Sequence, residues 1–140
     1  MPRRRGIALR GECSQGNTPW IGIGMTRERK EELLGKVFEM KDLVEYQEGT
    51  ISSRMIINNR AGSITIFSFD KDEGLSEHTA PYDAVVMILD GECQVWVAGV
   101  THTMRTGQTI IFPAHAPHAV SATSRFKMAL IMIRGKEDGQ

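Results

Sequence analysis

The side chains of this sequence best suited to chemistry are its histidines, of which it has 4. His78 lies in the segment 74–84, while His115 and His118 lie in the segment 107–118. An imidazole with a pKa of about 6.5 can transfer protons at neutral pH, and its ring nitrogens are good ligands for divalent metals. For His115 the sequence predicts a solvent-facing turn. For His102, which lies outside both segments, it predicts a structural or surface role.

The sequence also contains 2 cysteines, Cys13 and Cys93. Two cysteines are too few for a disulfide framework, and the CxxC spacing of thiol redox and zinc sites is absent from the sequence. Both are therefore predicted to be free thiols.

Length and composition describe the domain that must hold these side chains. A chain of 140 residues with 41% hydrophobic and 24% charged residues is typical of a single globular domain. Its 17 basic and 17 acidic residues give a net charge of +0, so no overall basic field favours nucleic acid or an acidic membrane. The sequence has no signal-like apolar run and nothing near the roughly 18 apolar residues of a membrane span. These features predict a soluble cytoplasmic protein with neither a nucleic-acid nor a membrane partner.

From residue 36 onward, short apolar and β-branched runs alternate with turn residues, which is typical of a small all-β barrel or sandwich. Asp90-Gly91 is the strongest turn signal, because both central residues of a type I′ hairpin need a positive φ. It predicts a two-residue hairpin, and consecutive hairpins imply an antiparallel sheet. The predicted strands cover residues 37–40, 51–57, 63–69, 84–89, 92–97, 100–105, 109–112, 118–122 and 126–133.

Pairing Leu89 with Glu92 across that hairpin divides the two strands into two faces. One face is small or apolar and is predicted to line the barrel interior: Ala84, Val86, Ile88, Cys93, Val95 and Val97. The other is predicted to face outward and carries a large aromatic residue: Val85, Met87, Leu89, Glu92, Gln94 and Trp96. An outer patch of Trp96, Met87, Val85 and Leu89 is larger than most monomers expose, so it predicts a homodimer.

Residues 1–35 form a predicted N-terminal extension ahead of a barrel at 36–134 and a short tail at 135–140. Residues 1–24 lack apolar periodicity and are expected to be loose. Thr26 can cap a short helix over 27–34, which Gly35 would end. Met25 stands just before this helix, so the upstream residues are a possible extension of a functional chain that begins there.

The two histidine-containing segments resemble the paired motifs of the cupin superfamily. The first motif of that family has a His-x-His pair, a Glu, six further residues and a Gly, and Gly91 matches its end. The second has a Gly, five residues, Pro-x-Gly, two residues and a His, matched by Gly107, Pro113 and His118. The resemblance covers about residues 36–134. It implies a single small antiparallel β-barrel of the jelly-roll type, a double-stranded β-helix.

The resemblance also implies a metal site that this sequence only partly retains. Cupins typically hold Fe, Mn, Ni or Zn with three imidazoles and a carboxylate, and here the ligand positions are His78, Ala80, Ala84 and His118. Two imidazoles alone seldom hold a metal tightly, because affinity depends on the number and geometry of ligands. Asp83 is adjacent to the missing Glu, but the two-residue period of a strand points it to the opposite face unless a bulge intervenes. His115 replaces the Gly of Pro-x-Gly, so a left-handed backbone is expected there, and Ala122 stands where the motif often ends in Asn.

Three roles remain open for His78 and His118: a hydrogen-bonded pair at the rim, ligands of a weakly held Zn, Mn, Ni or Fe ion, or acid/base groups. The favoured function is binding of an unidentified small molecule, with these histidines at the barrel mouth and a wall formed by Val86, Ile88, Cys93 and Val95. The alternative is a metal-dependent enzyme of the isomerase, dioxygenase or decarboxylase type, against which Ala80 and Ala84 count. A structural or regulatory dimer without chemistry is a third possibility, against which the retained histidine pair counts.

Overall fold

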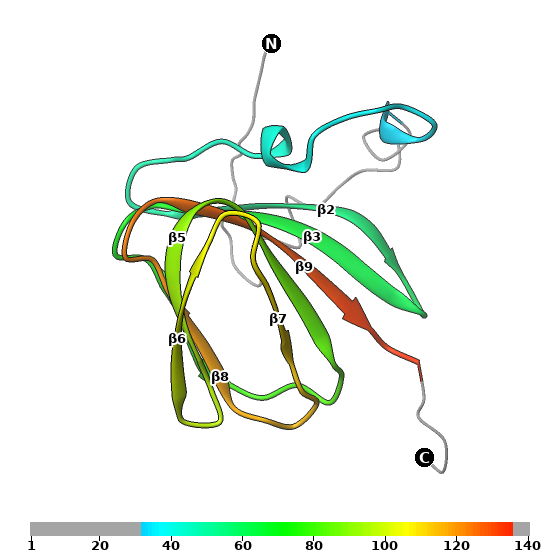
Figure 1. Ribbon diagram of the computed structural model, residues 1–140. Coiled ribbons are helices and arrows are strands. Elements are labelled where there is room, and N and C mark those ends of the chain that lie inside the picture. The colour runs from blue at the N-terminus through cyan, green and yellow to red at the C-terminus, as the bar shows by residue number, and fades with distance from the viewer. Residues whose placement is uncertain (1–31, 136–140) are drawn as a thin grey trace.

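The computed structural model describes residues 32–135, which form one curled antiparallel sheet (Figure 1). The sheet order is β2-β3-β9-β5-β8-β4, and β6 and β7 each pair with β5. The strands are β2 (Ile51–Asn59), β3 (Gly62–Phe69), β4 (Gly74–His78), β5 (Ala84–Val97), β6 (Val100–Arg105), β7 (Thr109–Phe112), β8 (His118–Ser121) and β9 (Phe126–Ile133). A short 3-10 helix, η2 (Met40–Leu43), precedes them. This architecture agrees with the predicted antiparallel all-β barrel.

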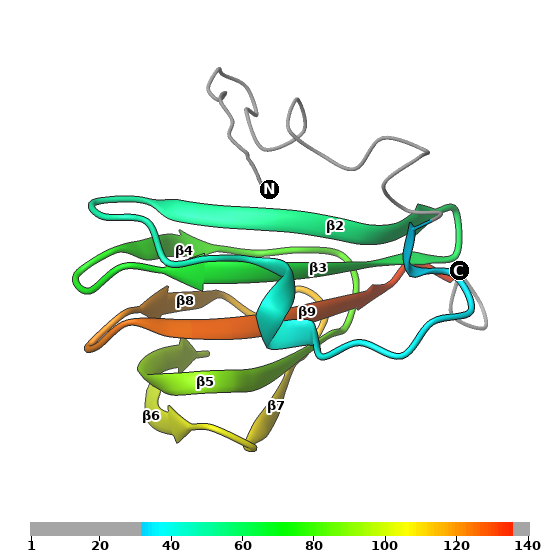
Figure 2. The same cartoon turned by 90° about the horizontal axis from the view of Figure 1, so that it is seen from above.

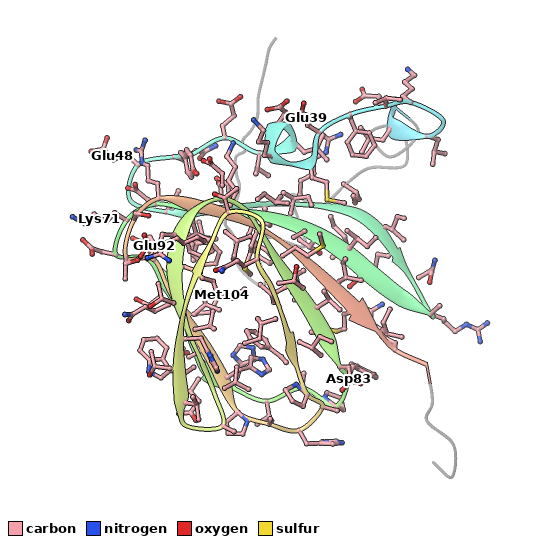
Figure 3. The ribbon with its side chains drawn as sticks, viewed as in Figure 1. Glu39, Glu48, Lys71, Asp83, Glu92 and Met104 are labelled. Atoms are coloured by element: carbon pink, nitrogen blue, oxygen red, sulfur yellow. The ribbon has the colours of Figure 1, made fainter. Side chains whose placement is uncertain are left out.

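Strand β5 joins the two sides of the barrel. Its first half pairs with β9 and β7, which together with β3 and β2 form what we call the β3 side. Its second half pairs with β8 and β6, which together with β4 form the β8 side. Strand β5 bends at one end of the barrel, which we call the bend end. The opposite end carries His78 and His118, and we call it the histidine end. Figure 3 shows Glu92 and Lys71 near the bend end and Asp83 at the other end of the strands.

The predicted hairpin at Asp90-Gly91 is wrong, because β5 runs without interruption through both residues. The register with β9 shifts between Ile88 and Asp90, so a bulge lies where the turn was expected. Gly91 has a φ of 91°, and a Cβ there would lie 2.1 Å from the backbone oxygen of Arg125. The positive φ that the sequence signalled is therefore used to bend a strand rather than to reverse it.

The inner face predicted from that hairpin is nevertheless correct, because the bulge also changes which residues point inward. One extra residue switches the alternation from even to odd numbers, so Ile88 and Cys93 point to the same side. The residues of this face pack with Phe69 and Phe126, whose rings are stacked with centroids 4.5 Å apart. The buried core comprises Phe69, Ala84, Val86, Ile88, Cys93, Val95, Met104, Phe112, Val120, Ala122, Phe126 and Met128.

The outer face of the β3 side is partly covered by residues 33–50, which we call the strap (Figure 2). Val44 packs with Ile66 and Ala129, and η2 contacts β3, β5 and β9. Lys127 Nζ donates to the Lys41 carbonyl oxygen at 2.7 Å, and Ser68 Oγ donates to that of Glu45 at 2.9 Å. The strand predicted at 37–40 is wrong: residues 36–39 have no regular structure and Met40 begins η2, with Met40 and Leu43 packed on the sheet face while Val37 and Phe38 are exposed.

The strap also changes the predicted dimer patch. Met87 and Leu89 pack against the cluster under the strap, on the outer face of the β3 side. Trp96 pairs with Ala119 and Thr101 and lies on the β8 side, beyond the bend of β5. The outward direction of these side chains was predicted correctly, but Trp96 does not form one patch with Met87, Val85 and Leu89.

Two further predictions concern the ends of the chain. The helix expected over 27–34 lies mostly outside the described residues, although Glu32 and Leu33 are helical and Gly35 follows them with a φ of 75°. The loose segment 1–24 and most of the tail at 135–140 lie outside as well. Strand β4 was not predicted, and it carries His78 as its last residue.

Candidate functional site

His78 and His118 meet where β4 ends and β8 begins. The two strands are antiparallel, and the register pairs these two residues directly, so their side chains share one face. Their Nε2 atoms lie 3.1 Å apart, and their rings are edge to face with centroids separated by 4.4 Å. The structure thus brings together the two histidines that the motifs selected.

The other nitrogen of each ring is held by a backbone carbonyl. His78 Nδ1 lies 2.8 Å from the oxygen of Ser76, and His118 Nδ1 lies 3.0 Å from that of Ala116. A carbonyl oxygen can only accept a hydrogen bond, so both Nδ1 atoms carry the hydrogen. In the neutral rings neither Nε2 then carries a hydrogen, so no hydrogen bond joins the two atoms, and the contact becomes attractive when a proton or a cation lies between them.

Phe112 stacks on the ring of His118. The two rings are stacked with centroids 4.4 Å apart, and His118 is only 5% exposed whereas His78 is exposed. Burial lowers the pKa of His118, the Ala116 carbonyl raises it, and the neighbouring His78 lowers it. The net shift is downward, so His118 favours its neutral form, which can accept a proton or bind a metal.

The predicted wall residues lie deeper in the barrel. Val86, Cys93 and Val95 have no exposed surface, and Ile88 is 2% exposed, all within the packed core. Burial and the charge of Glu92 raise the pKa of the Cys93 thiol to about 12, which makes this free thiol unreactive. A role for these four residues in binding a ligand remains a prediction.

The possible substitute ligands are placed away from the histidine pair. Asp83 Oδ1 accepts a hydrogen bond from Ala114 N at 2.8 Å and so fixes the loop after β7. His115 is exposed and has a φ of 71°, the left-handed backbone that the motif led us to expect, and its N donates to the Ala80 oxygen at 2.7 Å. His102 is exposed on β6, opposite Val95.

The ligand set is therefore incomplete. Within residues 32–135, no group of three or more His, Cys, Asp or Glu residues is placed to hold a metal ion. Ala84, at the position of the family's Glu, is 3% exposed and lies opposite Phe112 on β7.

Sequence reasoning missed Phe112, which contacts the histidine pair, and two hydroxyl residues that line the inner face of the barrel. Phe112 directly precedes Pro113 of the second motif, and the alternation of β7 places it inward next to His118. Ser63 and Thr65 are 8% and 4% exposed and, by register with Met132 and Leu130, lie on the inner face of β3. A polar–apolar alternation in Ser63 to Phe67 is the signal that identifies these inward hydroxyls.

No helix in the described part of the chain is long and apolar enough to span a membrane. Among curated proteins, none matches the chain.

Known structures and families give a consistent classification. Residues 65–134 match the cupin domain family. A conserved protein of unknown function from Streptococcus pyogenes is 32% identical, with a TM-score of 0.70 over 74% of this chain and 90% of that one.

Two further solved structures carry the family name. A cupin 2 conserved barrel domain protein from Leptotrichia buccalis is 42% identical, with a TM-score of 0.67 over 69% of this chain and 47% of that one. A cupin superfamily protein from Desulfitobacterium hafniense is 26% identical, with a TM-score of 0.69 over 72% of this chain and 93% of that one. The motif match, the barrel and these relatives together show that the chain belongs to the cupin family.

Proposed function

We propose that the barrel binds a small molecule at its histidine end, with His78 and His118 as the polar anchor. The observation that carries this proposal is the 3.1 Å approach of two Nε2 atoms whose partner Nδ1 atoms both face carbonyl oxygens. Two Nε2 atoms in contact without a hydrogen between them are a poor arrangement for an isolated pair of neutral rings. An anionic ligand whose binding is accompanied by uptake of a proton from water at one Nε2, or a ligand with a positive centre at this point, removes the conflict.

The surroundings of the pair suit a ligand that is both polar and apolar. Phe112 offers an aromatic face beside His118, and the inner face of β3 presents the Ser63 and Thr65 hydroxyls. Sites of this kind combine apolar walls with a few polar groups that fix orientation. An organic acid fits this chemistry, because its carboxylate can pair with an imidazolium that forms when one Nε2 atom takes up a proton from water.

A divalent metal fits the pair only in part. Both Nε2 atoms can contact one Zn, Mn, Ni or Fe ion, and the carbonyl oxygens that accept from Nδ1 orient the rings, as such acceptors do for metal-bound histidines. A tight site needs three or four protein ligands, and the described residues supply two. A bound ion would act as a Lewis acid toward an oxygen of the ligand.

The second candidate function is a metal-dependent cupin enzyme in which water or substrate completes the coordination. The retained orientation of the histidine pair favours it, while Ala80 and Ala84 oppose it because they remove two protein ligands. The two candidates differ in how much metal the isolated protein holds.

The test is a titration of untagged full-length protein with Zn²⁺ and, separately, with acetate at pH 7.5, followed by calorimetry and by NMR of nitrogen-labelled histidines. We expect weak Zn²⁺ binding and shifts of the Nε2 signals of both histidines, lost in His78→Ala and His118→Ala. His102→Ala, on exposed β6, is the matched control and should change neither. Stoichiometric metal in the purified protein would favour the enzyme, and an unperturbed pair in every titration would contradict the proposal.

A further inference from the structure

The residues just before His118 form a turn that sets the direction of its ring. Ala116 N donates to the Pro113 oxygen at 3.2 Å, which closes a β-turn over residues 113–116. The Ala116 oxygen accepts the hydrogen of His118 Nδ1 at 3.0 Å. A carbonyl group moves with the backbone that carries it, so the conformation of this turn decides how the His118 ring is held.

The turn is of a type that usually contains glycine. His115, its third residue, has a φ of 71°, and Ala114, its second residue, is not among the described residues with a positive φ. These values identify a type II turn, which favours Gly at the third position because a side chain disfavours the left-handed backbone. The cupin motif has Gly at this position, whereas this chain has His. Contacts from outside the turn are therefore needed to keep its conformation.

Two contacts from the loop between β4 and β5 hold the turn. His115 N donates to the Ala80 oxygen at 2.7 Å, and Ala114 N donates to Asp83 Oδ1 at 2.8 Å. The first bond joins two backbone groups, so it is available to almost any sequence. The second requires a side chain with an acceptor oxygen at position 83, and an ionised carboxylate makes the stronger kind of hydrogen bond.

Asp83 is well placed for this contact because its own backbone is fixed to the sheet. It immediately precedes β5, and Ile133 N of β9 donates to its carbonyl oxygen at 3.3 Å. Figure 3 shows Asp83 at the histidine end of the barrel. The Asp83 side chain therefore joins the turn before His118 to the strands of the barrel.

We propose that Asp83 is a positioning residue of the histidine pair, and that it compensates for His115 in place of the glycine of the motif. Its carboxylate fixes the turn, the turn places the Ala116 oxygen, and that oxygen keeps the hydrogen of His118 on Nδ1. His118 Nε2 then carries no hydrogen at its contact with His78. This inference rests on the proposed function, which requires Nε2 in that state. It gives Asp83 a role other than that of the substitute metal ligand considered from the sequence.

The test is the state of the His118 ring in ligand-free, full-length protein with nitrogen-labelled histidines. Long-range nitrogen–hydrogen NMR spectra show which ring nitrogen carries the hydrogen, and pH 7.5 lies above the usual imidazole pKa of about 6.5. We expect the hydrogen on Nδ1 in wild type and a mixture of both tautomers in Asp83→Ala. Amide hydrogen exchange at His115 and Ala116 should become about threefold to tenfold faster in that variant, the size expected for the loss of one hydrogen bond.

Three variants separate this role from a general loss of structure. Asp83→Asn keeps an acceptor oxygen at position 83, so the His118 tautomer should remain as in wild type. His115→Gly combined with Asp83→Ala should also restore it, because Gly adopts the positive φ without help. Asp70→Ala is the matched control: Asp70 Oδ2 accepts from Gly49 N at 2.6 Å at the bend end, and its loss should leave the His118 ring unchanged.

A separate Zn²⁺ titration links this role to the site. The weak affinity expected for wild type should fall by about threefold to tenfold in Asp83→Ala and be kept in Asp83→Asn. The tautomer and the affinity can fail independently. A wild type that binds neither Zn²⁺ nor acetate, with a His118 tautomer that still responds to Asp83→Ala, would contradict the proposed function and support the positioning role.

Three results would overturn the inference. The first is an unchanged His118 tautomer and unchanged exchange at His115 in folded Asp83→Ala. The second is a change in Asp83→Ala that Asp83→Asn shares or that His115→Gly fails to reverse. The third is a similar change in Asp70→Ala, which would mean that any loss of stability loosens the turn. Circular dichroism checks that each variant is folded. If Asp83→Ala does not fold, Asp83→Ser replaces it, since a serine hydroxyl is one bond shorter than a carboxylate oxygen.

Discussion

The two ends of the barrel are built from different interactions. At the bend end, the stacked rings of Phe69 and Phe126 fill the core beside Gly91, which no other residue can replace without a close contact. At the histidine end, the inward residues include His78, His118 and Phe112, and two orienting contacts run to backbone carbonyls. The bend end is arranged for packing, and the histidine end places polar atoms in an arrangement that packing alone does not require.

The bend end also carries a group of polar contacts on its outer surface. Tyr46 donates a hydrogen bond to Asp90, and the cationic groups of Arg125 and Lys127 lie 5.4 Å and 4.9 Å from its ring centroid. Arg125 Nε donates to Asp70 Oδ1 at 2.8 Å, and Gly49 N donates to the other carboxylate oxygen. These contacts fasten the strap to the bend end.

The comparison predicts the largest loss of stability for a core change at the bend end. Phe126→Ala should lower the free energy of unfolding by about 3 to 5 kcal/mol, because it removes a fully buried ring and leaves a cavity. Denaturant unfolding measures this loss. Phe38→Ala is the control, since Phe38 is 39% exposed and should cost far less. A similar loss in both variants would mean that the stacked pair is not the main packing unit.

A change at the histidine end should cost less and add a function. Ala80→His combined with Ala84→Glu restores the two missing family ligands, and we expect Zn²⁺ affinity to rise at least about 100-fold over wild type. Ala84 is 3% exposed, so the larger side chain should cost about 1 to 3 kcal/mol of stability through overpacking. Bound metal should offset this cost by stabilising the native state.

Calorimetric titration of the wild type and the double variant with Zn²⁺ at pH 7.5 measures the gain. The same double change in a His118→Ala background is the control and should lose most of the added affinity. A folded double variant without added affinity would show that the ligand positions are out of register.

Much of the fold was predictable from sequence, because most strands coincide with local apolar runs. The run at residues 126–133 coincides with β9, while β4 was missed because its residues are mostly exposed and lack apolar alternation. The Asp90-Gly91 signal was misread because a positive φ serves a bulge as well as a hairpin. The bulge is decided by the pairing of Gly91 with Phe126, which is distant in sequence.

The site was predictable only in its residue types. Motif spacing selected His78 and His118, and cross-strand pairing of β4 with β8 makes their approach a consequence of the fold. The carbonyls that fix their Nδ1 atoms depend on loop conformation, for which the sequence has no local pattern. The strand of Phe112 was predicted at 109–112, but its contact with His118 is a tertiary one that the strand pattern does not show.

A smaller effect concerns acid stability at the bend end. Hydrogen bonds from Gly49 N and Arg125 lower the pKa of Asp70 to about 2. A carboxyl group with a lowered folded-state pKa stabilises the protein above its unfolded pKa of about 3.9, and this contribution is lost as the pH falls from there toward 2. Unfolding measured between pH 5 and pH 2, values chosen to bracket this window, should decline less steeply in Asp70→Asn than in wild type. Equal slopes would show that this carboxylate does not fasten the strap.

The smallest expected effect is that of removing residues 1–24. The strap begins at residue 33, and three hydrogen bonds attach it to the sheet. Lys127 and Ser68 donate to backbone oxygens of the strap, and Tyr46 of the strap donates to Asp90. None of these contacts involves the removed segment, which also lacks apolar periodicity in its sequence. The free energy of unfolding should therefore change by less than about 2 kcal/mol, the size of effect that marks core damage. A full-length Trp20→Ala, Ile21→Ala variant is the matched control in denaturant unfolding. A larger loss in both proteins would show that these two apolar residues dock on the barrel. The N-terminal part of the chain would then be held by them as well as by the contacts at the bend end.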